Sequence, residues 1–179
     1  MPGTSPRTRL IFQNLNLYVG PAALSGTTAT GGMYAGGNAG NNLIAELANI
    51  QSASLSVGIN RTDINAFGQL QRFAQVLISP PTISLDFSYN LTDGYNEQML
   101  GFNTNGGSFI SGILTKVSDS KNYFISMSQQ GVDDDSVTNP NQRDVLAAGN
   151  GYVSNYSVNV AVGQVASASV TVDALNVVA

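Results

Sequence analysis

The sequence predicts a mainly all-β protein: an antiparallel β-sandwich or β-barrel with one short flanking helix and a flexible, Gly-rich N-terminal arm. The main observation is residues 82–91, where apolar residues alternate with polar ones without a single error. The apolar residues are Ile83, Leu85, Phe87, Tyr89 and Leu91, and between them lie Ser84, Asp86, Ser88 and Asn90. A strand places all of these apolar side chains on one side, whereas a helix would spread them around its surface. A second observation is that other short period-two segments follow, separated by turn residues.

The segments next to residues 82–91 support this fold class. Residues 52–59 form an expected strand with Leu55, Val57 and Ile59 on one face. Residues 71–79 form another expected strand, which Pro80-Pro81 separates from residues 82–91 because proline donates no ladder hydrogen bond.

The flanking helix is predicted from Tyr95 to Leu100. Thr92 or Asp93 would cap its N-terminus, and Gly101 suits the position just after its C-terminus.

The second half of the chain predicts four more strands. Residues 108–117 and 121–128 are expected to form a hairpin, with the turn at Ser118-Asp119-Ser120. A long polar loop follows from Gln129 to Asp144, and Gly149-Asn150-Gly151 is an expected turn. The last expected strands span 152–162 and 166–178, and the second changes its apolar parity from Val170 and Val172 to Leu175 and Val177. A β-bulge would cause such a change.

The N-terminal part differs from the rest, so we divide the chain into an arm, residues 1–51, and a β-domain, residues 52–179. Residues 20–42 are rich in Gly, Ala, Thr and Asn and would bury too little surface to offset the entropy of ordering them. They predict a disordered leader in the free monomer, or an arm that orders against a neighbouring subunit. Residues 43–50 would form helical turns or continue into the next strand.

The composition indicates a protein without catalytic, cofactor-binding or metal sites. The chain has no His and no Cys, which removes the commonest general base, the thiol nucleophile and the usual zinc ligands. Only 10% of its residues are charged, its net charge is −4, and its seven basic residues are scattered along the sequence. Gripping a nucleic-acid backbone needs several cations on one face, so such binding is not expected. No apolar run approaches the length of a membrane-spanning helix, and residues 1–10 do not resemble a signal peptide.

The acidic run Asp133, Asp134, Asp135 has three interpretations. It is a solvated loop, which we favour, a cation site, or a contact with basic residues of a neighbouring subunit. The cation interpretation is weakened because the spacing of a folded calcium loop is absent. Further candidate assembly contacts are Met33, Tyr34, Tyr95 and Glu97. Tyr152 and Tyr156 would form a stacking platform or, more simply, pack within the sheet.

Four phrases carry a resemblance beyond composition. They are RTDINAFGQL (61–70), PTISLDFSYNLTDG (81–94), Asn96-Glu97 with Leu100-Gly101-Phe102, and GNGYVSNYSV (149–158). In this order, and with the closing VGQVASASVTVDALNV, the chain resembles the major tail or tail tube proteins of tailed bacteriophages. The resemblance implies a β-barrel or sandwich with a flanking helix.

The resemblance also implies a function. Such subunits assemble with themselves into rings, commonly hexamers, which stack into a tube that joins other phage tail proteins. Viral DNA passes through the tube without specific binding. The implied location is the tail of the virion, after assembly in the bacterial cytoplasm, with no membrane partner and no cofactor. Exposed strand edges that pair between subunits, together with an acidic, low-friction channel, would perform this work.

Two alternatives remain open at the level of sequence. One is a capsid decoration or head-completion protein, which would share the composition. The other is a surface glycan-binding or pilin-like β-sandwich module, although glycan-binding modules usually expose aromatic residues and this chain has no Trp.

Overall fold

A computed structural model describes residues 15–21, 44–65, 72–77, 79–114, 120–128 and 143–178 of the chain. Its strands are β1 (Leu15–Pro21), β2 (Ala45–Glu46), β3 (Ile50–Gly58), β4 (Arg61–Asn65), β5 (Arg72–Leu77), β6 (Thr82–Asn90), β7 (Lys121–Ser128), β8 (Arg143–Asn159), β9 (Ser167–Ala174) and β10 (Asn176–Val178). Its helices are α1 (Tyr95–Leu100) and α2 (Ser111–Leu114). Every strand pair is antiparallel, so the all-β prediction is confirmed.

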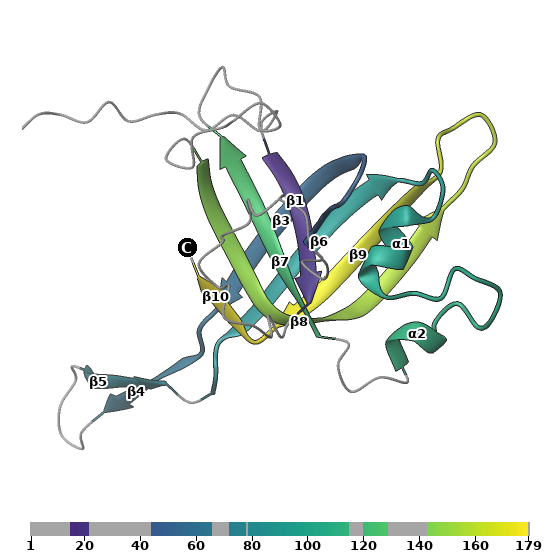
Figure 1. The fold of residues 1–179 in the computed structure, drawn as a ribbon. Helices are drawn as coiled ribbons and strands as arrows, with labels where there is room; N and C mark the ends of the chain where they lie inside the picture. The colour runs from purple at the N-terminus through teal and green to yellow at the C-terminus, as the bar shows by residue number, and fades with distance from the viewer. Residues whose placement is uncertain are drawn as a thin grey trace, which may run out of the picture.

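The strands form two layers that share the long strand β8. Sheet A consists of β2, β1, β7, the first part of β8, and β10. Sheet B consists of the second part of β8, β9, β6 and β3, in that order. In Figure 1, β1 and β7 of sheet A cross in front of β3 and β6 of sheet B. A separate two-stranded sheet, β4–β5, extends from the end of β3.

Residues 82–91 behave as their alternation predicts. In β6, Ile83, Leu85, Phe87 and Tyr89 are all buried. The core lies between the two sheets, where these side chains meet Leu17 and Val19 of β1, Tyr123 and Ile125 of β7, and Ala168, Val170, Val172 and Ala174 of β9.

The helix α1 has the predicted bounds. Gly101 adopts a left-handed conformation after it, with φ of 103°. The Gly101 and Phe102 amides donate to the carbonyls of Gln98 and Glu97 at 3.1 and 2.9 Å, which is the Schellman pattern. At the other end the cap residue is Gly94 rather than Thr92 or Asp93. Asp93 still contributes, because its Oδ1 accepts a 3.2 Å hydrogen bond from the Tyr95 amide.

The expected strand over residues 108–117 is wrong, because Ser111–Leu114 form the short helix α2. Both edges of β7 are already paired, with β1 and β8, so no edge remains for a hairpin partner. The amide and the hydroxyl of Ser111 both donate to the Ser108 carbonyl, at 2.9 and 2.7 Å, which starts the helical turn. The second strand of that expected hairpin, residues 121–128, is confirmed as β7.

The expected turn at Gly149-Asn150-Gly151 is also wrong, since these residues lie inside β8. They are the point where β8 leaves sheet A and enters sheet B. Asn150 takes a positive φ of 52°, and its amide donates to Asn122 Oδ1 at 3.0 Å. A Cβ at Gly151 would lie 2.6 Å from Val172, so only glycine allows the close approach there.

The parity change near Leu175 is a corner between strands rather than a bulge. β9 ends at Ala174, and β10 then pairs with the first part of β8. The Leu175 amide donates to the Gly149 carbonyl at 3.1 Å, so this corner lies next to the point where β8 changes sheets.

Part of the expected N-terminal arm belongs to the core. β1 pairs with β7 along its whole length, and Leu17 and Val19 are only 1% and 2% exposed. Residues 43–50 are expected from sequence either to form helical turns or to continue into the next strand. From residue 45 the structure has the second of these, because β2, a turn at Ala48-Asn49 and β3 follow one another. The division of the chain after residue 51 itself stays a prediction.

Candidate assembly interface

Helix α1 is fixed to sheet B by the carboxylate of Glu97, which is 4% exposed. Glu97 Oε1 accepts hydrogen bonds from the Tyr89 hydroxyl at 2.7 Å and the Tyr156 hydroxyl at 2.9 Å. Burial, followed by the bond to Glu97, raises the pKa of Tyr89 well above its ordinary value and that of Tyr156 to about 12. Both phenols therefore stay protonated at neutral pH and act as donors to the carboxylate.

The neighbouring residue, Asn96, fixes α1 to the turn between β2 and β3. Its Oδ1 accepts from the Ala48 amide and its Nδ2 donates to the Ala48 carbonyl, both at 2.8 Å. Asn96 is 4% exposed, so these bonds are shielded from water. Asn96 and Glu97 together connect the turn before β3 to Tyr89 and Tyr156 on the inner face of sheet B.

An aromatic cluster continues this attachment. The Phe102 ring lies 4.6 Å from that of Phe109 and 4.8 Å from that of Tyr156, measured between centroids. Phe109 and Tyr156 are 5.6 Å apart. The segment from α1 to α2 therefore packs on the second part of β8, beside which α1 and α2 lie in Figure 1.

Sheet B has two open edges among the described residues. β3 pairs only with β6, and Tyr152–Asn159 of β8 pair only with β9. The backbone N–H and C=O groups on the other side of each strand have no ladder partner in the described part of the chain. Such edges are templates for pairing with another chain.

Exposed apolar side chains lie close to both edges. Val57 of β3 is 47% exposed and Ile59 just beyond it 50%, although both share the inner-face parity of Leu55. At the other edge Val158 is 47% exposed, and Ile110 and Leu114 of the α1–α2 segment are 50% and 70% exposed. The residues expected at 160 and 162 of the strand lie beyond its end at Asn159.

The outer face of sheet B has no large aliphatic side chain among the described residues. Its cross-strand rows contain short polar residues, two aspartates, one tyrosine and one glycine: Ser52, Ser54, Ser56, Gly58, Thr82, Ser84, Asp86, Ser88, Asn90, Ser167, Ser169, Thr171, Asp173, Tyr152, Asn155, Ser157 and Asn159. None of them is buried, and none is a Lys or Arg. Several bond to one another, as Ser52 does to Ser88 at 2.6 Å and Thr171 to Asp86 at 2.7 Å.

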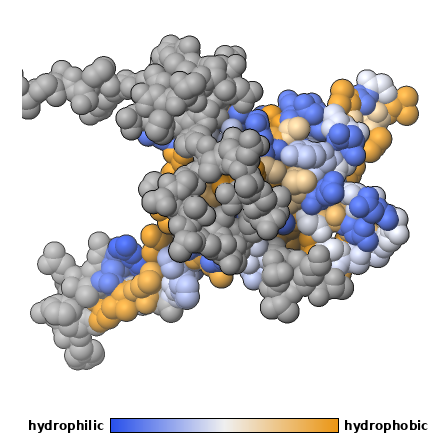
Figure 2. All heavy atoms as spheres, viewed as in Figure 1, coloured by the Kyte–Doolittle hydropathy of each residue, from blue (hydrophilic) through white to orange (hydrophobic). Residues whose placement is uncertain are grey.

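The β4–β5 hairpin has no covering layer among the described residues. Ile64 and Val76 lie on the same face and are 45% and 48% exposed, and Leu77 is 51% exposed. Gln75 donates to Asp63 at 2.8 Å across the two strands. Figure 2 shows hydrophobic residues gathered on this projection. An isolated two-stranded hairpin is marginally stable in water, so this one is suited to contact another molecule.

The assembly contacts predicted from sequence differ in their exposure, and some of them lie outside the described residues. Tyr95 is 39% exposed at the start of α1, where a partner can reach it. Glu97 is buried and bonded within the chain, so its visible role is internal. Met33, Tyr34 and Asp133, Asp134, Asp135 lie outside the described residues. All of them stay predictions as assembly contacts. Sequence reasoning expected exposed strand edges but did not identify the two strands that form them, because this depends on pairings between distant strands.

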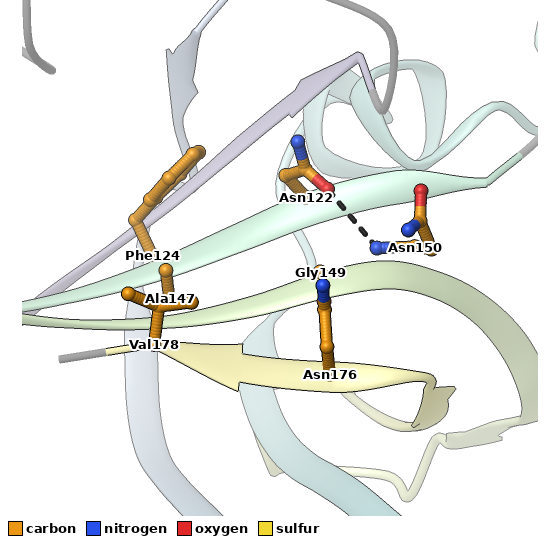
Figure 3. A pocket seen from close by; sticks show the side chains of 7 residues that line it. All are labelled: Asn122, Phe124, Ala147, Gly149, Asn150, Asn176 and Val178. Atoms are coloured by element: carbon orange, nitrogen blue, oxygen red, sulfur yellow. Dashed lines mark hydrogen bonds between the residues drawn. The ribbon is translucent and has the colours of Figure 1, made fainter.

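A surface cavity of about 260 Å³ lies on sheet A near β10 (Figure 3). Its lining consists of Asn122, Phe124, Ala147, Gly149, Asn150, Asn176 and Val178. These residues supply neutral amides and apolar groups, none of which titrates near neutral pH. The cavity therefore offers no group for acid–base chemistry.

Other kinds of site are not seen in the described part of the chain. It contains no group of three or more acidic residues placed to hold a metal ion. None of its helices is long and apolar enough to cross a membrane.

No family model matches the chain, and no curated protein matches it. Some solved structures do match the chain. A chain of the tail of an empty gene transfer agent (GTA) particle, computed with C6 symmetry, matches with a TM-score of 0.52 and 8% identity, over 94% of this chain and 96% of that one. A chain of the six-fold symmetrised anti-feeding prophage (AFP) baseplate matches with a TM-score of 0.51 and 8% identity, over 98% and 96%.

The SPP1 tail tube matches with a TM-score of 0.49 and 12% identity, over 95% of this chain and 78% of that one. The two matches above 0.5 span nearly all of both chains, so the resemblance covers the complete described fold rather than one motif. At these identities the shared property is the fold. This chain therefore has the β-fold of chains in phage-tail-like particles.

Proposed function

We propose that this chain is a tail tube subunit: a structural virion protein whose copies join into rings that stack into a tube for genome passage. The observation that carries the proposal is sheet B, which has an open edge on each side and a polar, cation-free outer face. Its fold, shared with chains of a tail and a baseplate of six-fold symmetry, supports the same function.

The ring would form by pairing β3 of one copy with Tyr152–Asn159 of the next. Such a contact is heterologous, because a different surface is used on each side, and repeated contacts of this kind close into a ring. Six copies agree with the symmetry of the two similar particles. Pairing would also cover Val57 and Ile59 with the apolar groups beside the other edge, and it would remove both open edges.

In this ring the outer face of sheet B would line the channel. DNA binding requires cations, whose contacts with phosphates release counterions. The described outer face has none, and it carries Asp86 and Asp173 instead. Its short side chains, several of them fixed by mutual hydrogen bonds, also leave few groups that could catch on a passing duplex. DNA would then pass without specific binding.

The β4–β5 hairpin is suited to the contact between stacked rings. It projects from the body at the end of β3, and its Ile64 and Val76 have no cover among the described residues. We expect the tube to join other phage tail proteins at its ends. The subunit would belong to the tail of the virion and assemble in the cytoplasm of the bacterial host.

Negative-stain electron microscopy of the purified chain tests the proposal. We expect hollow tubes with a regular ring repeat. The substitution Val57→Asp places a charge at the β3 edge, where pairing would bury it, so it should abolish tubes and leave a folded monomer.

Val177→Asp is the matched control. Val177 is 38% exposed, and it lies on β10, away from both edges of sheet B. It should leave tube formation intact. Wild-type protein that stays monomeric at high concentration, or that binds glycans as a monomer, would contradict the proposal. Equal loss of tubes in both variants would contradict the assignment of the β3 edge.

A further inference from the structure

The buried Glu97 carboxylate connects two strands that are not neighbours. Tyr89 lies on β6, in the middle of sheet B, and Tyr156 lies on β8, at its edge, with β9 between them. Alternate strands of a sheet are roughly 10 Å apart, so the two phenols have to lean together over β9 to reach one oxygen. The opposing β9 residues Ala168 and Val170 are small enough to leave this space.

The two strands that carry these phenols differ in how many neighbouring strands they pair with. β6 is paired on both sides, with β3 and β9, so its position does not depend on Tyr89. The second part of β8 has a ladder partner only on the β9 side among the described residues. Its pairing is also interrupted by a register shift between Val153 and Asn155. A strand that is paired on one side only, with its ladder locally disrupted, has fewer backbone hydrogen bonds to fix its shape.

Tyr156 supplies that contact. Its hydroxyl is bound by Glu97 and its ring packs against Phe102 and Phe109, all from the α1–α2 segment. The segment itself is fixed elsewhere, because Asn96 binds the backbone of Ala48. The carboxylate therefore connects the edge strand to a segment that is also bonded to the turn between β2 and β3.

We propose that Glu97 is a positioning residue that holds the β8 edge, through Tyr156, in the shape that pairs with β3 of a second copy. The inference rests on the proposed function, because the pairing is the ring contact described above. This role needs no direct contact between Glu97 and the partner. Glu97 acts on assembly through the strand.

The matched substitutions Tyr156→Phe and Tyr89→Phe test this. Each removes one hydroxyl from the same Glu97 oxygen and keeps its ring. If Glu97 only stabilised the fold, the two would affect assembly alike. We expect Tyr156→Phe to raise the protein concentration needed for tubes about tenfold, the scale of one lost hydrogen bond to a charged group. Tyr89→Phe should raise it less than about twofold, although it lowers the melting temperature as much.

Hydrogen exchange in the monomer gives a second measurement that does not depend on tubes. Tyr156→Phe should speed exchange at the amides of Tyr152–Asn159, whereas Tyr89→Phe should leave them unchanged. Wild-type protein without tubes would overturn the proposed function, and exchange would still decide the role of Glu97. Tubes that form equally in both variants, or equal exchange in the edge strand, would overturn the inference alone.

Discussion

The outer faces of the two sheets differ, although both sheets contribute to one core. On sheet A, a cross-strand row consists of Tyr18, Phe124, Ala147 and Val178, with Glu46 of the edge strand β2 at its end. Two outward serines of the same sheet, Ser126 and Ser128, are 0% and 1% exposed. On sheet B, the equivalent row of Ser52, Ser88, Ser169 and Ser157 faces outward without being buried.

This difference separates a packing face from a solvent face. A row that is apolar except at its edge, with buried serines beside it, belongs against other protein atoms, because the transfer of its apolar side chains from water is favourable. A row of serines with two aspartates nearby gains little from any protein cover and stays hydrated. The comparison thus supports sheet B, rather than sheet A, as the lining of a water-filled channel.

The largest expected effect is on stability. Phe124→Ala on the outer face of sheet A should lower the free energy of unfolding by about 2 kcal/mol, since a half-buried phenylalanine loses part of its packing. Ser169→Ala at the centre of the outer face of sheet B should change it by less than about 0.5 kcal/mol. Urea denaturation followed by circular dichroism measures both. Equal losses would show that the two faces are packed alike.

A smaller effect distinguishes the phenols on the inner faces. The Tyr123 hydroxyl of sheet A is buried and has no hydrogen-bond partner among the described residues, and burial raises its pKa. Tyr123→Phe removes this unsatisfied group, so it should leave stability unchanged or raise it by about 1 kcal/mol. Tyr156→Phe, which removes a satisfied hydroxyl, should lower it. Thermal unfolding of the two variants gives the comparison, and a clear loss in Tyr123→Phe would indicate a partner for that hydroxyl.

Sequence alone predicted the elements whose signal is local. The alternation in β6 and the glycine after α1 each lie within about ten residues, and both elements were confirmed. The errors concern long-range pairing. β1 gains its place from β7, about a hundred residues away, and β8 changes sheets at Gly149–Gly151 where the sequence resembles a turn.

The candidate site divides in the same way. The polar side of β6 was visible from alternation, and the polar outer face of sheet B extends it across the neighbouring strands. The bond from Glu97 to Tyr156 spans 59 residues, so no local pattern indicates it. A glutamate in a short helix ordinarily faces solvent, and only the closeness of two phenols explains its burial.

The smallest expected effect on stability belongs to two lysine substitutions on the outer face of sheet B, which should nevertheless increase DNA binding. Ser54→Lys with Ser169→Lys adds two cations to the outer face of sheet B, at exposed positions where the fold should tolerate them within about 0.5 kcal/mol. Thr104→Lys with Asn105→Lys adds the same charge at exposed positions between α1 and α2.

If the outer face of sheet B lines the channel, a ring repeats its new cations around the lumen, where they reach phosphates. Tubes of the first variant should then retain a short DNA duplex on sedimentation, and salt should release it. Wild-type tubes and tubes of the control should retain little. Equal retention by both variants would place the outer face of sheet B outside the channel, because the added charge alone would then explain binding.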